Sequence, residues 1–186
     1  MSPPPEITTP RLRLRPWQDR DRAPFAALNA DPEVMEWMPA VLTRAESDAA
    51  VDRYVQHFAT HGFGFWVVEV PDVTPFAGFV GLAVPTFLAH FTPCVEIGWR
   101  LARDHWGRGY ATEAGRAALQ FAFTELDLDE VVSFTPRQNR RSRAVMERLG
   151  LRHDPVDDFV HPGLAEDHPL QPLVLYCTPR DARSRA

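Results

Sequence analysis

Trp106-Gly107-Arg108-Gly109-Tyr110-Ala111 lies between a stretch typical of a strand and a stretch typical of a helix. The strand pattern covers 95–101, and the helix pattern runs from Thr112 through alanine-rich sequence to about Leu126. Glycines between a strand end and a helix start leave backbone N–H groups free, and the helix dipole adds positive charge there. The segment therefore predicts an anion site, with a plain tight turn as the alternative.

Along the rest of the chain, the hydrophobic pattern is first typical of helices, then of strands, and finally of strands and helices in alternation. The expected strands are 11–15, 65–70, 76–84, 131–135 and 173–178, and the expected helices are 19–29, 43–60 and 140–149. Helices first, then antiparallel strands, then alternating elements predict a mixed α/β (α+β) fold. The 186 residues suit a single domain over 1–186, with 1–9 as a flexible tail and 154–172 as a long loop.

The composition excludes several classes of function. The 20 basic residues are all arginine, so a Walker-type phosphate loop is excluded because it needs a lysine. The net charge of −5 disfavours a dedicated nucleic-acid binder. Cys94 and Cys177 form neither a disulfide framework nor a metal motif. Without an apolar leader or span, we expect a cytoplasmic protein that contacts no membrane.

Three motifs in order resemble a known superfamily. They are Glu96-Ile97-Gly98-Trp99-Arg100-Leu101, then the run from Trp106 to Ala114, then Asn139-x-x-Ser142 with Met146-Glu147-Arg148-Leu149-Gly150. Together they look like the Gcn5-related N-acetyltransferase (GNAT) superfamily, in its RimJ/RimL-like branch of ribosomal-protein N-terminal acetyltransferases. The resemblance covers almost the whole chain and implies a central, mostly antiparallel, seven-stranded sheet flanked by helices.

The resemblance also implies acetyl-CoA as the donor and an amine as the acceptor. The residues that it assigns to the cofactor are Ile97, Trp99, Leu101, Trp106, Gly107, Arg108, Gly109, Tyr110, Ala111, Thr112 and Asn139. Trp106 departs from the Gln or Arg usual at the first loop position. Arg103, Arg108 and Arg143 are candidates for the CoA phosphates, with plain surface charge as the alternative. Asn139 has a second interpretation as a helix N-cap.

Two residues are candidates for catalysis by the same resemblance. The superfamily often places a tyrosine acid where this chain has Met146, so Ser142, one turn earlier, is the candidate acid toward the leaving thiolate. Its alternative is a residue that merely caps the helix. Glu96 is the candidate base, with a structural partner of Arg100 or another arginine as the alternative.

The resemblance places the acceptor side at Trp37 and at the loop that holds His161 and His168. Either histidine is a candidate pocket wall or a structural cap of the loop, and Trp37 is a candidate acceptor contact or core residue. The loop acids Asp157, Asp158, Glu166 and Asp167 favour a cationic acceptor. We expect no metal. The branch favours a protein N-terminal amine as the acceptor, with a small amine such as a polyamine or drug as the alternative. A catalytically silent acyl-CoA-binding module is the alternative from a different class of function, and a homodimer is left open.

Overall fold

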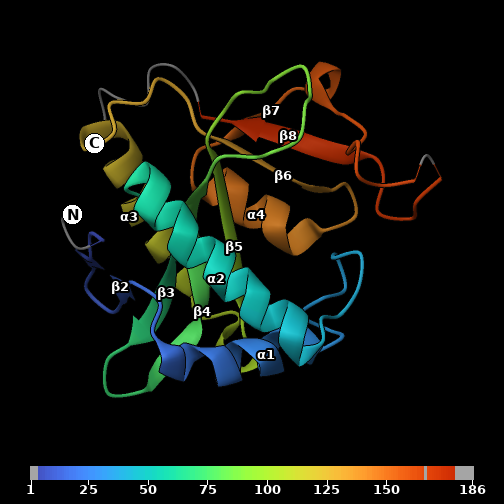
Figure 1. The fold of residues 1–186 in the computed structure, drawn as a ribbon. Coiled ribbons are helices and arrows are strands. Elements are labelled where there is room, and N and C mark those ends of the chain that lie inside the picture. The colour runs from blue at the N-terminus through green and yellow to red at the C-terminus, as the bar shows by residue number, and fades with distance from the viewer. Residues whose placement is uncertain (1–3, 166, 179–186) are drawn as a thin grey trace.

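One eight-stranded sheet runs through the chain in the computed structural model, which describes residues 4–165 and 167–178 (Figure 1). Its order is β1-β2-β3-β4-β5-β6-β8-β7, and β5 with β6 is the parallel pair. The strands are β1 (Ile7–Thr8), β2 (Arg13–Arg15), β3 (Phe65–Val70), β4 (Thr74–Ala83), β5 (Glu96–Leu101), β6 (Val132–Pro136), β7 (Arg152–His153) and β8 (Leu173–Cys177). The α-helices are α1 (Arg22–Ala30), α2 (Arg44–His61), α3 (Tyr110–Thr124) and α4 (Arg140–Arg148).

This arrangement confirms the mixed α/β fold with a mostly antiparallel sheet flanked by helices. The resemblance implies seven strands and the sequence patterns predicted six, whereas the sheet has eight, because β1 and β7 have two residues each and are too short to show a period. The tail expected over 1–9 is wrong for Ile7–Thr8, which pair with β2. Residues 1–3 lie outside the described part, and the single domain stays a prediction.

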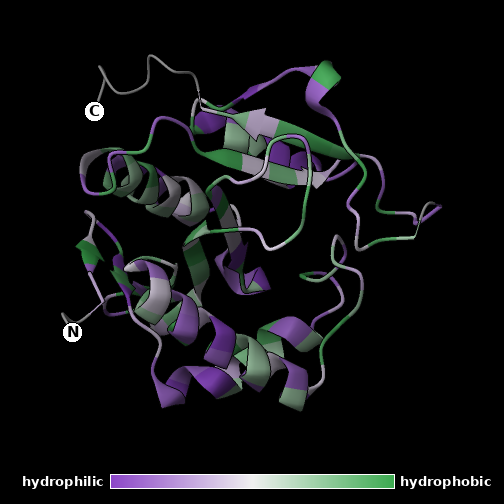
Figure 2. Ribbon diagram, turned by 45° about the horizontal axis from the view of Figure 1, so that its top comes forward, coloured by the Kyte–Doolittle hydropathy of each residue, from purple (hydrophilic) through white to green (hydrophobic). Residues whose placement is uncertain are grey.

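The helices cover opposite faces of the sheet. Phe25 of α1 and Tyr54 of α2 pack on Phe79 of β4, with ring centroids 5.9 and 5.6 Å away. Phe121 of α3 packs on Trp66 of β3 at 5.3 Å, and Trp66 stands opposite Val80, the residue after Phe79. Since successive strand residues alternate in direction, α1 and α2 lie over one face and α3 over the other. Figure 2 shows hydrophobic strands between helices whose outer sides are more hydrophilic.

The bounds of α2 follow from its sequence. The Thr43 side chain accepts a hydrogen bond from the Glu46 N–H, and the Glu46 carboxylate accepts one from the Thr43 N–H, which is a capping box. Gly62 ends the helix with φ at 77°, a value that glycine adopts without strain. Within the described residues, no helix combines the length and apolar character needed to cross a membrane.

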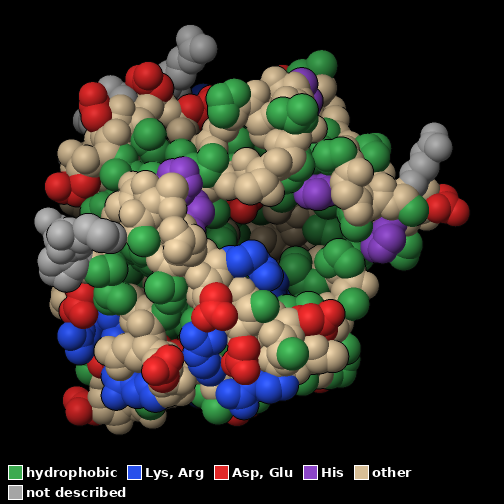
Figure 3. Space-filling view, in the orientation of Figure 1, with side chains coloured by type: hydrophobic (Ala, Val, Ile, Leu, Met, Phe, Trp, Pro, Cys, Tyr) green, Lys and Arg blue, Asp and Glu red, His purple; other side chains and the backbone are tan. Residues whose placement is uncertain are grey.

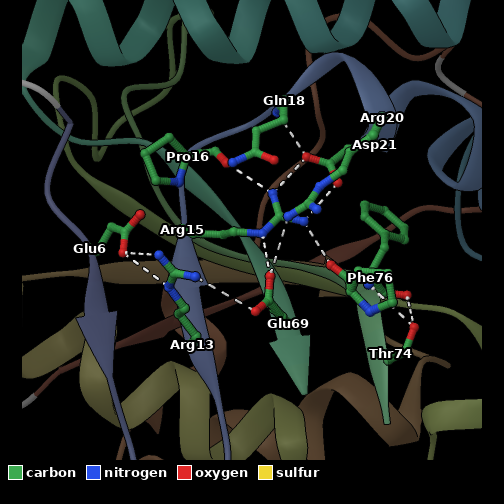
Figure 4. A network of polar contacts seen from close by, with 11 residues as sticks. Glu6, Arg13, Arg15, Pro16, Gln18, Arg20, Asp21, Glu69, Thr74 and Phe76 are labelled. Atoms are coloured by element: carbon green, nitrogen blue, oxygen red, sulfur yellow. Dashed lines mark hydrogen bonds and ion pairs between the residues drawn. The ribbon is translucent and has the colours of Figure 1, made fainter. Parts of the chain in front are cut away.

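A buried ionic network joins the N-terminal strands (Figure 4). Arg15 has no exposed surface, and its guanidinium contacts Asp21 at 2.7 Å and Glu69 at 2.7 Å. The same group donates to the Pro75 carbonyl at 2.7 Å. Arg15 therefore links β2, the turn η1 (Asp19–Asp21), β3 and β4 through a cation whose charge is fully matched by carboxylates.

Candidate active site

The parallel strands β5 and β6 meet at one point and then part. Glu96 pairs with Val132, the Val132 N–H donates to the Val95 carbonyl at 2.9 Å, and the Ser133 hydroxyl donates to the Ile97 carbonyl at 2.8 Å. The N–H and C=O of one residue lie on the same side of a strand, so those of Trp99 also point into the gap beyond. An extended ligand can pair there as an added strand does.

A cleft of about 1270 Å³ opens at this gap. Eleven of the residues singled out from the sequence line it: Trp37, Trp99, Leu101, Trp106, Gly107, Gly109, Tyr110, Ala111, Thr112, Asn139 and Ser142. Five do not: Glu96, Ile97, Arg108, His161 and His168. The N-terminal segment from Ile7 to Arg11 also borders the cleft, which sequence patterns did not indicate.

The glycine loop enters α3 with free backbone donors. Gly107 and Gly109 have φ of 72° and 80°, values that side chains with a Cβ rarely adopt. The first helical hydrogen bond runs from the Glu113 N–H to the Gly109 carbonyl at 3.0 Å. The N–H groups of Tyr110, Ala111 and Thr112 precede it and have no partner within the helix. This geometry suits a phosphate at the positive end of α3.

The cleft is cationic although the chain carries a net charge of −5. Six arginines and two glutamates line it: Arg11, Arg100, Arg116, Arg140, Arg141 and Arg148, with Glu33 and Glu113. Arg140 and Arg141 directly follow Asn139 in the first turn of α4, and that position was the signal that sequence reasoning missed. The charge and size of the cleft fit the phosphates of a nucleotide-bearing ligand such as CoA.

Neither Arg103 nor Arg143, the other two phosphate candidates, is among the residues that line the cleft. Arg143 donates to the Tyr176 hydroxyl at 3.1 Å, on the side of β8, and does not line the cleft. Arg103 pairs with Glu33 at 2.7 Å, and although Arg103 is not a lining residue, its partner Glu33 is. As a phosphate candidate Arg143 was therefore misplaced by sequence reasoning, and Arg103 stands beside the cleft.

Two guanidinium groups stand over the indole of Trp106, which lines the cleft. Arg103 stands 4.9 Å and Arg141 4.4 Å from its ring centroid. Arg141 also pairs with Glu36 at 2.6 Å. We call Trp106, Arg103, Arg141, Glu33 and Glu36 the clasp. It joins α4 and the loop before α3 to the connection between α1 and α2.

Asn139 acts as the N-cap of α4. Its Oδ1 accepts from the Ser142 N–H at 3.1 Å, and its Nδ2 donates to the Thr135 hydroxyl at 2.9 Å. The capping interpretation is thus observed directly. The Ser142 hydroxyl has no hydrogen-bond partner among the described residues, and it lines the cleft. Met146, one turn later, is 1% exposed and is part of the core.

Glu96 lies where β5 and β6 meet, and burial raises the pKa of its carboxyl group to about 7. Within the described residues, no ion pair joins Glu96 to Arg100 or to another arginine, so the structural alternative for Glu96 is wrong. Its side chain shares a face with Gly98 and Arg100, because alternate strand residues point the same way. This is the face that α1 and α2 cover, and Figure 3 shows a hollow beside α2 with basic, histidine and hydrophobic side chains around it.

The two histidines of the long loop, His161 and His168, make contacts within the fold. His161 packs on Phe87 with centroids 4.3 Å apart, and its Nδ1 accepts from the Gly163 N–H at 3.0 Å. Burial lowers the pKa of His161. His168 accepts likewise from the Leu170 N–H at 3.2 Å. Both rings cap the loop.

One acid of this loop has a cationic partner within the fold. Asp158 pairs with Arg137 and, at 2.6 Å, with His153, while Asp157 stands 3.9 Å from His90. Glu166 lies outside the described residues. Asp158 therefore serves the fold, and the cationic acceptor stays a prediction. In the described part of the chain, no three His, Cys, Asp or Glu side chains gather into a set that could hold a metal ion.

Comparison with known proteins agrees with this geometry. A family model described as an acetyltransferase (GNAT) domain matches residues 11–152. The uncharacterized protein YkkB of Bacillus subtilis (strain 168) is 32% identical over 149 residues, which is 80% of this chain and 86% of YkkB. The FsC-acetyl coenzyme A-N(2)-transacetylase of Aspergillus fumigatus is 37% identical over 175 residues, which is 87% of this chain and 73% of that protein.

A solved structure extends the similarity to three dimensions. The acetyltransferase from Agrobacterium tumefaciens str. C58 is similar with a TM-score of 0.76 and 28% identity, and the match covers 94% of each chain. The family match, the sheet order and the cleft between β5 and β6 all agree. The chain therefore belongs to the GNAT family of acetyltransferases.

Proposed function

We propose that this chain transfers the acetyl group of acetyl-CoA to a primary amine in the cleft between β5 and β6. The observation that carries the proposal is the cleft itself, in which a strand edge, the start of α3 and the arginines of α3 and α4 converge. A thioester with a long polar arm and several phosphates needs these three features together: a strand to pair with, free N–H groups and cations.

Different residues serve different parts of the donor. The N–H and C=O of Trp99 face the gap and suit the amides of the pantetheine arm. The N–H groups of Tyr110, Ala111 and Thr112 suit the pyrophosphate. Arg116, Arg140 and Arg148 lie where α3 and α4 border the cleft and suit the remaining phosphate charge. When bound, acetyl-CoA supplies an acyl group that an uncharged amine can attack.

Glu96 and Ser142 supply the proton transfers in this proposal. A carboxyl group with a pKa of about 7 is half ionised at neutral pH, so Glu96 can take a proton from the incoming amine, through a water molecule where direct contact is not made. The unpartnered hydroxyl of Ser142 lies in the cleft and can donate to the leaving thiolate.

For the acceptor, we propose a small-molecule amine. The support is the relative with 37% identity, whose name states transfer from acetyl coenzyme A to a nitrogen of FsC. A protein N-terminal amine is the second candidate, supported by the resemblance of the motifs to ribosomal-protein N-terminal acetyltransferases. A cytoplasmic location and a homodimer stay predictions.

The test is release of free CoA thiol from acetyl-CoA, measured against a panel of small primary amines and N-terminal peptides. Turnover with an amine supports the proposal, and the preferred acceptor decides between the two substrate classes. Tight acetyl-CoA binding without turnover on any acceptor would instead identify a silent acyl-CoA-binding module.

A further inference from the structure

Arg100 of β5 places a guanidinium group in the wall of the cleft with only neutral partners. Nη1 donates to the Asn29 Oδ1 at 2.7 Å, and Nη2 contacts the Met38 Sδ at 2.9 Å. The group also stands 5.4 Å from the ring centroid of Phe79, the residue directly opposite on β4. Among the described residues, no carboxylate lies within 4 Å of it, and its positive charge is therefore uncompensated.

Burying a guanidinium group without a counter-ion costs free energy unless a ligand supplies the negative charge. Burial lowers the pKa of Arg100, which shows that its surroundings disfavour the cation. Asn29 is fully buried, and its amide is held by a second hydrogen bond, from Nδ2 to the Ser47 hydroxyl at 2.8 Å. The position of Arg100 is thus fixed by a neutral amide where an aspartate of nearly the same shape would have neutralised it.

The guanidinium retains donors for a ligand. It carries five N–H groups, of which two are used by Asn29 and Met38, and its planar fork matches the two oxygens of a carboxylate. Arg100 is on the face covered by α1 and α2, together with Glu96, whereas Trp99 points to the α3 face. The uncompensated cation therefore lies on the side of the candidate base.

We propose that Arg100 binds a carboxylate of the acceptor, so that the substrate is a small molecule carrying both a primary amine and a carboxylate. The inference rests on the proposed function and names the substrate class of that site. The amine would lie near the point where β5 and β6 meet, and the carboxylate further along β5, beside Arg100. Glu96 and Arg100 are four residues apart, or about 13 Å along a strand, which leaves room for a linker between the two groups.

The experiment compares amino carboxylates with their uncharged amides. The probes are glycine, 4-aminobutanoate and 6-aminohexanoate, each against its amide, at equal concentrations of free amine with thiol release as the readout. For at least one pair we expect kcat/KM to favour the carboxylate about tenfold or more. Arg100→Gln should reduce this ratio to about one, while the KM for acetyl-CoA and the Tm stay unchanged. Arg44→Gln is the matched control, because it removes an exposed guanidinium of α2 outside the cleft.

A second variant separates binding from a structural role. Asn29→Asp keeps the shape of the partner but gives Arg100 a fixed counter-ion. It should lower the carboxylate preference at least several-fold with Arg100 still in place, and the Tm should not fall. If Arg100 only anchors β5 to α1, an ion pair between Arg100 and the new aspartate would leave the preference for carboxylates over amides intact. That result would overturn the proposal.

Other outcomes are equally decisive. Equal activity on carboxylates and amides in the wild type would support the acetyltransferase function and overturn the role of Arg100. A rise in the KM for acetyl-CoA in Arg100→Gln would assign the residue to the donor instead. Calorimetry of 6-aminohexanoate in the presence of CoA is independent of turnover. Selective binding there without thiol release on any amine would contradict the proposed function while supporting the carboxylate site.

Discussion

Two arginines of the same sheet, Arg15 of β2 and Arg100 of β5, have opposite electrostatic surroundings. Arg15 is fully buried between Asp21 and Glu69, and every side of its guanidinium is matched by a carboxylate or carbonyl. Arg100 stands in the cleft beside an amide, a thioether and an aromatic ring. The difference teaches that a compensated buried charge holds the fold, whereas an uncompensated one marks a place for a ligand.

The largest expected effect lies in the compensated region. Arg15→Met leaves Asp21, which is 1% exposed, without its cation, and it should destabilise the fold by about 3–5 kcal/mol. A loss of this size corresponds to a fall in Tm of roughly 10 °C for a chain of this length. Calorimetry measures it, with the exposed Arg13→Met as the control. Altered acceptor preference in folded Arg15→Met would break the comparison.

At the point where β5 and β6 meet, Glu96→Gln should lower kcat by about 10³ at neutral pH, because the base is lost. The pKa of about 7 is raised above the ordinary value, so ionised Glu96 disappears as the pH falls below 7. The amine, with a pKa near 10.4 if lysine-like, loses its free form over the same range. For the wild type, log kcat/KM should therefore rise with slope two below pH 7 and slope one above it.

The variant should show slope one throughout. A slope of two that survives in Glu96→Gln would assign the titration near pH 7 to another group and remove Glu96 from the mechanism. Glu96→Asp serves as the conservative control and should retain the break in slope.

Ser142→Ala should lower kcat by about 10² with the KM for acetyl-CoA nearly unchanged, since only the proton for the leaving thiolate is lost. The helix cap survives, because Asn139 bonds to the backbone N–H of residue 142 and not to its hydroxyl. Steady-state kinetics on folded protein measure the effect. Unchanged kcat, with chemistry shown to be rate-limiting, would leave the hydroxyl without a catalytic role.

Gly109→Val should weaken acetyl-CoA binding at least about tenfold, or about 1.4 kcal/mol. A β-branched residue is strained at φ 80°, and its Cβ would stand 3.4 Å from Nη2 of Arg11, a residue that lines the cleft. Gly62→Val is a matched control, because Gly62 has φ 77° but ends α2 away from the cleft. Calorimetric titration of both variants with acetyl-CoA should show weaker binding for the first alone.

The smallest kinetic effect is expected for the double variant His161→Ala with His168→Ala. Both side chains cap their own loop and neither lines the cleft, so the acceptor KM should stay within about twofold. Loss of the packing between His161 and Phe87 should instead lower the Tm by a few degrees. A selective rise in the acceptor KM would restore the loop as a wall of the acceptor pocket.

The helices and strands with a clear hydrophobic period, or with capping residues at their ends, were predictable from the sequence. The strand before the glycine loop, the helix after it and the Thr43–Glu46 cap all appear where local chemistry placed them. Two-residue strands such as β1 and β7 depend on pairing with distant segments and leave no local pattern. The glycine loop of the cleft was found because it is one contiguous motif.

The acceptor side was harder to predict because its residues come from separate elements. Composition drew attention to His161 and His168, which the fold uses for capping. Arg100 was quoted in a motif without a role, since nothing local reveals that Asn29 and Met38, about 70 and 60 positions earlier, are its neighbours. Whether a charge is matched depends on tertiary contacts, and sequence patterns do not show these.

The contacts of Trp106 in the clasp affect the fluorescence of its indole. An indole in contact with guanidinium groups emits differently from one that faces water, and both Arg103 and Arg141 stand within 5 Å of the Trp106 ring centroid. Arg141 is held at that ring by a surface ion pair with Glu36, of a kind worth at most about 1 kcal/mol. A phosphate that enters the cleft competes for the same guanidinium. We therefore expect entry of the donor to change the fluorescence of Trp106, which is one of five tryptophans in the chain.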